Sequence, residues 1–84
     1  MGGMFFLERF LVYPDGDQQE IDFDPAFDDL VDLNGRPLAM PLTSARIIAY
    51  RVAKIRRVEE KGQDTVLYHL ELVPSWELEG LVHR

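Results

Sequence analysis

The chain has 84 residues, enough for one domain with a thin hydrophobic core and too few for two. It contains no cysteine, which excludes a disulfide scaffold, thiolate metal ligands and thiol catalysis, and favours a reducing, cytoplasmic location. Its net charge is −6 and its apolar runs are far too short for a membrane span, so a membrane is excluded as a partner and nucleic acid is disfavoured.

The first part of the chain predicts a strand pair. Residues 4–13 are rich in aromatic and aliphatic side chains, and a turn sequence, Pro-Asp-Gly-Asp, follows at 14–17. Residues 20–24 then alternate strictly between acidic and apolar side chains, as a half-buried strand does. We therefore expect two strands joined across residues 14–18.

Residues 24–41 carry two conflicting signals. Asp24 followed by Pro25 is typical of a helix start, whereas Asn34-Gly35 between short alternating runs is typical of a hairpin. Both are satisfied by a short helical turn near 25–31 and a tight turn at Asn34-Gly35. Two prolines then confine residues 36–41 to an edge strand or an extended loop.

The firmest prediction is a hairpin between Ile47 and Val73. Residues 65–73 alternate well and need an antiparallel neighbour, which the β-branched segment 46–59 supplies across a polar, glycine-containing turn. A helix over 45–55 is the alternative, because apolar residues also recur there at helical spacing. Strand alternation would place Val52 and Ile55 on opposite faces.

Pro74 ends this hairpin, and residues 75–84 are expected to form a tail or a short edge strand. The whole chain, 1–84, is then one small, mainly β domain. We expect five to six mostly antiparallel strands in a barrel-like or rolled sheet, with at most one helical turn. Residues 1–3 fit either a native start or an added leader before Met4.

Charge is distributed in blocks along the chain. Residues 1–35 hold nine acids and one base, residues 36–57 hold six bases and no acid, and residues 58–84 are acidic again. The basic block contains a stripe that, beside an aromatic side chain, would suit single-stranded nucleic acid on a small barrel. This stripe consists of Arg51, Lys54, Arg56 and Arg57. Cross-strand ion pairs with neighbouring carboxylates are the simpler interpretation, and the surrounding acidic charge favours it.

No motif predicts a cofactor, a metal site or catalysis. The aspartates between Asp22 and Asp32 lack the ligand and glycine positions of a calcium loop, and the two histidines lack partners for a zinc site. Neither serine lies in a glycine-flanked elbow, and there is no glycine-rich phosphate loop. We therefore expect a protein that is not an enzyme.

The chain has more aromatic and aliphatic side chains near its ends than a thin core requires. The leading hypothesis is therefore a protein-interaction module acting through an edge strand or an exposed apolar surface, either with another protein or as a homodimer. The candidate surface residues are Trp76, Leu78 and Tyr50. A small β-barrel that binds single-stranded nucleic acid through the basic stripe is the alternative.

Overall fold

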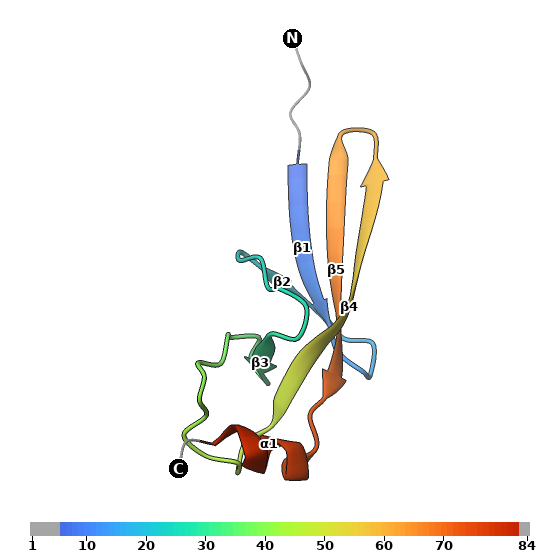
Figure 1. The fold of residues 1–84 in the computed structure, drawn as a ribbon. Helices are drawn as coiled ribbons and strands as arrows, with labels where there is room; N and C mark the ends of the chain where they lie inside the picture. Colours follow the sequence, from blue (N-terminus) through green and yellow to red (C-terminus); the bar gives the residue numbers. More distant parts are fainter. Residues whose placement is uncertain (1–5, 83–84) are drawn as a thin grey trace.

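A five-stranded mixed sheet and one short helix make up the fold (Figure 1). The computed structural model describes residues 6–82, so the question of a leader at 1–3 lies outside the described residues. The elements are β1 (Phe6–Val12), β2 (Gln18–Ile21), β3 (Leu30–Asp32), β4 (Ala49–Glu60), β5 (Gln63–Leu72) and α1 (Ser75–Leu81). The strand order is β2-β1-β5-β4-β3. The predicted mainly β fold with mostly antiparallel strands is confirmed. Only the pairing of β1 with β5 is parallel among the strands of the described residues.

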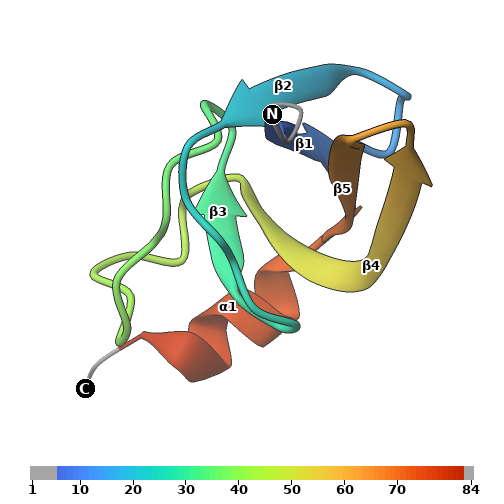
Figure 2. The same ribbon diagram turned by 90° about the horizontal axis from the view of Figure 1, so that it is seen from above.

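The sheet rolls into a half-barrel, as the view from above shows (Figure 2). Its two end strands, β2 and β3, do not pair, and the seam between them is crossed near the end of β3. Side chains bridge the seam between them: Gln19 Nε2 donates a hydrogen bond to the Asn34 carbonyl at 2.8 Å, and the Tyr13 hydroxyl lies 3.4 Å from the Asp32 carbonyl. The rolled sheet predicted from the sequence is therefore present as a half-barrel, and side chains connect its two ends at this seam.

Two apolar clusters lie on opposite faces of the sheet. Neighbouring residues Leu30 and Val31 belong to different clusters, because successive side chains of a strand point to opposite faces. The inner cluster draws residues from β1, β3, β4 and β5 into the roll, and α1 covers the outer one. The inner cluster is Leu11, Val31, Val52, Tyr68 and Leu70, and the outer cluster is Leu30, Leu42, Ala49, Val73 and Leu78.

Tyr68 joins the inner cluster to the loop that follows β2. Its side chain is buried, and its hydroxyl donates a hydrogen bond to Asp24 Oδ1 at 2.6 Å. Burial, with the nearby Asp24 carboxylate, raises the pKa of Tyr68 to about 12. The phenol therefore stays protonated at neutral pH and remains a hydrogen-bond donor inside the core.

The predicted hairpin is confirmed as β4 and β5, and the helical alternative over 45–55 is wrong for β4. Lys61 and Gly62 form its turn with φ of 39° and 84°, as a two-residue hairpin of type I′ requires. A β-bulge interrupts the pairing between Val52 and Lys54. Because of this extra residue, Ile55 lies opposite Tyr68 and shares a face with Val52, so the simple alternation expected for this strand is wrong past Ala53.

The helical turn expected near 25–31 is absent. Residues 26–29 instead form a tight turn, in which the Asp29 amide donates to the Ala26 carbonyl at 3.0 Å. The backbone groups of Asp28 and Asp29 also bind Val52, with N···O distances of 2.9 Å in both directions, which fixes this turn beside β4. Asp28 has a φ of 72°, outside the right-handed helical region, and Asp24 binds the Tyr68 hydroxyl where a helix N-cap was expected. Pairing with β4 therefore outweighs the local helix signal.

The tail expected at 75–84 contains the helix of this fold. The Pro74 carbonyl accepts hydrogen bonds from the amides of Glu77 and Leu78, at 3.0 and 3.1 Å, and starts α1. Leu78 belongs to the outer cluster, and Leu81, one turn later, packs against it, which stabilises a helix too short to persist alone. Val82, in extended conformation after the helix, packs there too. In residues 6–82, no helix combines the length and apolar character needed to cross a bilayer.

Candidate functional site

Two tight turns of the same type lie next to each other at one side of the half-barrel. In the first, the Gly16 amide donates to the Tyr13 carbonyl and the Tyr13 amide donates to the Asp17 carbonyl, both at 2.8 Å. Gly16 has a φ of 95°, which a side chain would strain. Asp15 Oδ1 accepts a hydrogen bond from the Asp17 amide at 3.0 Å, so both carboxylates project from one short, fixed turn.

The second turn repeats this pattern between β3 and residue 37. The Gly35 amide donates to the Asp32 carbonyl at 3.0 Å, and Gly35 has a φ of 80°. Asp32 Oδ1 accepts hydrogen bonds from the amides of Asn34 and Arg36 at 2.8 and 2.9 Å. The turn predicted at Asn34-Gly35 is therefore confirmed, and it leaves the Leu33 side chain 56% exposed.

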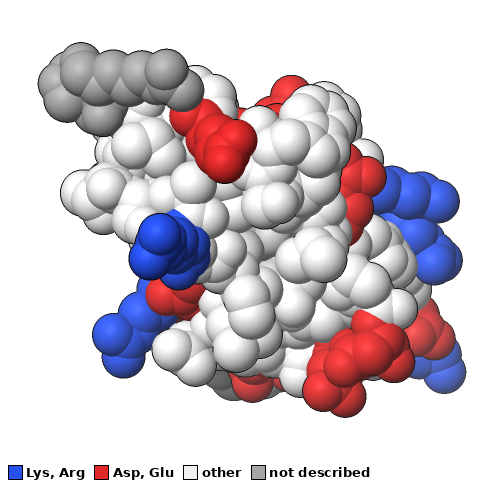
Figure 3. Space-filling model, turned by 90° about the horizontal axis from the view of Figure 1, so that it is seen from below, with Lys and Arg blue, Asp and Glu red and all other residues white. Residues whose placement is uncertain are grey.

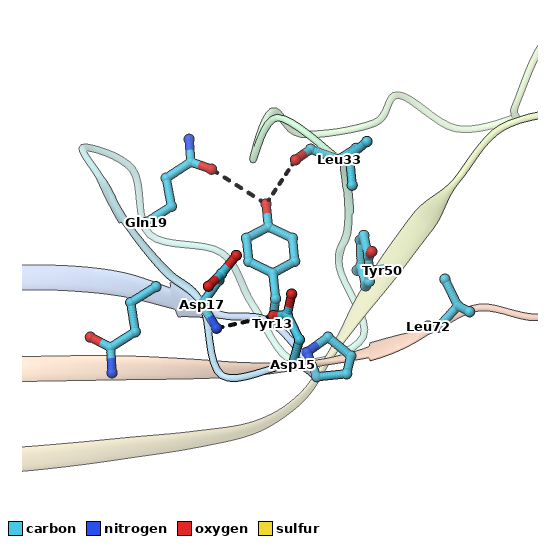
Figure 4. Close-up of a pocket in the computed structure, with 9 residues that line it drawn as sticks. Tyr13, Asp15, Asp17, Gln19, Leu33, Tyr50 and Leu72 are labelled. Carbon is cyan, nitrogen blue, oxygen red and sulfur yellow. Dashed lines mark hydrogen bonds between the residues drawn. The ribbon is translucent and has the colours of Figure 1, made fainter.

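A hollow of about 510 Å³ lies between these turns, β4 and the end of β5 (Figure 4). Its floor is aromatic: the Tyr13 and Tyr50 rings meet edge to face, with centroids 4.9 Å apart and planes at 87°. Leu33 and Leu72, both 56% exposed, add aliphatic surface. The lining residues are Tyr13, Pro14, Asp15, Asp17, Gln18, Gln19, Leu33, Tyr50 and Leu72.

The polar groups of the hollow lie on its rim. Asp15 and Asp17 are exposed and supply negative charge, and Gln19 supplies an amide. The Tyr13 hydroxyl lies 3.4 to 3.5 Å from Gln19 Oε1 and the Asp32 and Leu33 carbonyls. Burial and the Asp32 carboxylate raise the pKa of Tyr13, so its hydroxyl stays a neutral donor that ties the floor to the second turn.

The chemistry of the lining favours a cation as the occupant of the hollow. An aromatic floor beside two carboxylates attracts positive charge, because the ring faces and the carboxylates both carry negative potential.

The structure separates the three residues expected to form an interaction surface. Tyr50 lines the hollow and packs on the inner cluster. Trp76 is 72% exposed on α1, which fits a surface role. Leu78, by contrast, is 2% exposed within the outer cluster, so its assignment to a surface is wrong. The alternation of Trp76 and Leu78 suggested one strand face, but in a helix these two residues diverge.

The basic stripe is divided by ion pairs. Arg51 binds Glu71 at 3.1 Å and Glu77 through both terminal nitrogens, which raises the pKa of Arg51 and lowers that of Glu77. Arg57 binds the buried carboxylate of Asp64, which raises the pKa of Arg57. Lys54 and Arg56 are exposed and make no ion pair within the described residues. Cross-strand pairing therefore accounts for half of the stripe.

Sequence reasoning did not identify most of the hollow. Tyr13, Asp15, Asp17, Leu33 and Leu72 come from three separate segments, and only the pairing of the strands brings them together. The two turns that contain Gly16 and Gly35 were the one signal of this site in the sequence, because turns of the same type hold their side chains in similar directions. Their proximity depends on the roll of the sheet, which the sequence pattern does not specify.

The comparisons with known proteins identify a family without indicating an activity. No curated protein and no solved structure matches the chain. A family model described as "Uncharacterised Treponema protein" matches residues 5–81, nearly the whole length. The chain therefore belongs to this family of Treponema proteins.

Proposed function

We propose that this chain is a non-enzymatic protein-interaction module, and that the hollow between Tyr13 and Tyr50 receives a Lys or Arg side chain of a partner protein. The observation that carries the proposal is an aromatic floor next to the paired carboxylates of Asp15 and Asp17. A cation over an aromatic face is attracted by about 0.5–1 kcal/mol at an exposed site and by more once water is displaced.

The size of the hollow supports this occupant. Its volume of about 510 Å³ lies within the usual range of ligand sites and would hold one long side chain with part of its backbone. The exposed aliphatic surface of Leu33 and Leu72 would contact apolar neighbours of that side chain. The partner segment is then a basic residue flanked by apolar ones.

The charge of the whole chain supports a basic partner over a nucleic acid. The net charge is −6, which would speed the approach of a cationic segment and oppose that of a polyanion. The end of the molecule that carries α1 is largely uncharged at its centre, with charged residues around it (Figure 3). The absence of cysteine fits a module that works in the cytoplasm.

Titration with two capped peptides, followed by amide NMR shifts, tests the proposal. One peptide carries Arg between two Leu residues, and in the other Glu replaces Arg. We expect the Arg peptide to shift the amides of residues 13–19, 33 and 50. Asp15→Asn with Asp17→Asn should weaken its binding, and Tyr50→Leu should weaken it roughly twofold to fivefold.

Asp22→Asn is the matched control for Asp15→Asn and Asp17→Asn tested singly, because each variant removes one exposed carboxylate and Asp22 does not line the hollow. Equal binding of the two peptides, or equal effects of the Asp15, Asp17 and Asp22 variants, would contradict a charge-selective hollow. A single-stranded oligothymidine is the third probe. Salt-sensitive binding of that probe, lost on changing Lys54 and Arg56, would instead support the nucleic-acid alternative.

A further inference from the structure

The outer edge of β4 is open above its bulge. β3 pairs only with Ala49, Tyr50 and Arg51, and the backbone of residues 28 and 29 binds Val52. Within residues 6–82, no segment pairs with the outer edge of residues 54–60, which forms the rim of the sheet in both ribbon views (Figures 1 and 2). An unpaired edge of this length is a template for another strand.

The turn of the hairpin determines which backbone groups face this open edge. The residues that flank a two-residue turn exchange backbone hydrogen bonds, so Glu60 directs its N–H and C=O toward β5. Alternate residues do the same, and the residues between them direct their groups outward. The outward residues are therefore Ile55, Arg57 and Glu59, and an added strand would bond to these three.

The sequence along this edge complements itself in charge. Residues 56–60 read Arg-Arg-Val-Glu-Glu. If a second copy pairs antiparallel about Val58, Arg57 meets Glu59 of the other copy and Arg56 meets Glu60. Registers centred one residue away place Arg57 opposite Arg57 or Glu59 opposite Glu59. Like charges directly opposite one another are unfavourable, so only the register about Val58 satisfies every pair.

We propose that two copies of this chain associate through residues 56–60 of β4, paired antiparallel about Val58 to join the two sheets into one. The occupant of the open edge is thus a second copy of this chain, and the interface has twofold symmetry, in which each Arg–Glu pair occurs twice. This interface lies apart from the hollow, so it stands independently of the function proposed for Tyr13 and Tyr50.

Charges within one copy support this pairing. Glu59 lies directly opposite Asp64 on β5, a like-charge cross-strand pair that is unfavourable in a single chain. Arg57 binds Asp64, and no ion pair is formed by Glu59, Glu60 or Arg56 within the described residues. The second copy would bring its Arg57 beside Glu59, its Arg56 beside Glu60 and its Glu60 beside Arg56. Each of the three side chains without an ion pair would then have a neighbour of opposite charge.

Sedimentation equilibrium over a range of concentrations tests the proposal, with amide hydrogen exchange as a second measurement. We expect a mass approaching twice the 9.7 kDa of one chain, with concentration-dependent protection of the Arg57 and Glu59 amides. Arg56→Glu and Glu60→Arg should each weaken association roughly tenfold or more, because each variant places like charges together at two symmetric sites.

Charge exchange then separates pairing from any loss of fold. Mixing the Arg56→Glu and Glu60→Arg chains, or combining both substitutions in one chain, restores both ion pairs and should restore association. Arg46→Glu is the matched control, since it makes the same change of charge at an exposed position outside the paired segment 56–60. A wild-type chain that stays monomeric at every concentration, or a mixture that fails to recover association, would overturn the proposal.

Discussion

The sheet consists of two regions that are stabilised in different ways. We name residues 6–8 and 54–67 the arm, and the remaining described residues the base. Both apolar clusters lie in the base, on either face of the sheet. The arm contains a single buried residue, and that residue is the carboxylate Asp64. Apolar burial therefore stabilises the base, whereas the arm depends on strand pairing and charge.

The two proposed contacts lie in different regions, the hollow on the base and the open edge of β4 on the arm. A hollow that must keep its shape lies on the base, where two fixed turns and a packed cluster define it. An edge that must add a strand lies on the arm, where pairing needs exposed backbone and not a deep core. Substitutions matched across the two regions provide direct tests of the comparison.

The largest effect is expected from the outer cluster. Leu78→Ala removes a side chain that is 2% exposed and should lower the free energy of unfolding by about 2–5 kcal/mol. Ile55→Ala removes an aliphatic side chain of the arm that is 44% exposed and should cost less than about 1 kcal/mol. Urea unfolding measures both. Equal losses for the two variants would show that the arm has a core of its own.

The two glycine turns of the base should differ by a smaller amount. Gly16→Ala meets no atom within 4 Å, so only its positive φ is strained, at about 1 kcal/mol. In Gly35→Ala the new Cβ would lie 2.7 Å from Gln19 Nε2 and would also displace its hydrogen bond to Asn34, worth about 0.5–1.5 kcal/mol more. Thermal unfolding compares the two. A larger loss for Gly16→Ala would contradict the side-chain bridge at the seam.

The smallest effect is a dependence on pH. Arg51 holds the pKa of Glu77 below its ordinary value of 4.5, so the ion pair that joins α1 to β4 stabilises the fold fully above that value. This contribution is lost as the pH falls through the lowered pKa. Glu77→Gln should therefore lower the Tm at neutral pH and have little effect near pH ~3. Glu79→Gln, at an exposed position on the same helix, is the control, and an identical pH profile would contradict the prediction.

Elements whose partner is close in sequence could be predicted, and those defined by distant contacts could not. The alternation of β5 and the Lys61-Gly62 turn are local, so the hairpin follows from residues that neighbour one another. The parallel pairing of β1 with β5 joins strands more than fifty residues apart, and no local pattern encodes it. Residues 25–31 have good helix signals, yet hydrogen bonds to Val52 determine their conformation.

The candidate sites follow the same rule. The basic stripe was visible because Arg51, Lys54, Arg56 and Arg57 lie together in the sequence, but their carboxylate partners on β5 and α1 depend on register. Trp76 was expected at the surface and is exposed, whereas the burial of Leu78 depends on a helix that packs on the outer cluster. Residue type predicted the kind of contact, and topology determined which residues make it.

The bulge at Ala53 reconciles two independent constraints on β4. The two-residue turn at Lys61 sets the alignment of the arm with β5, while pairing with β3 and burial of Ala49 and Val52 set the alignment of the base. These alignments are out of step by one position, and the extra residue absorbs the difference. Deleting Ala53 would therefore turn either Ala49 and Val52 out of their apolar clusters, or Arg57 to the face opposite its partner Asp64. One residue of length thus keeps the packing of the base compatible with the ion pair of the arm.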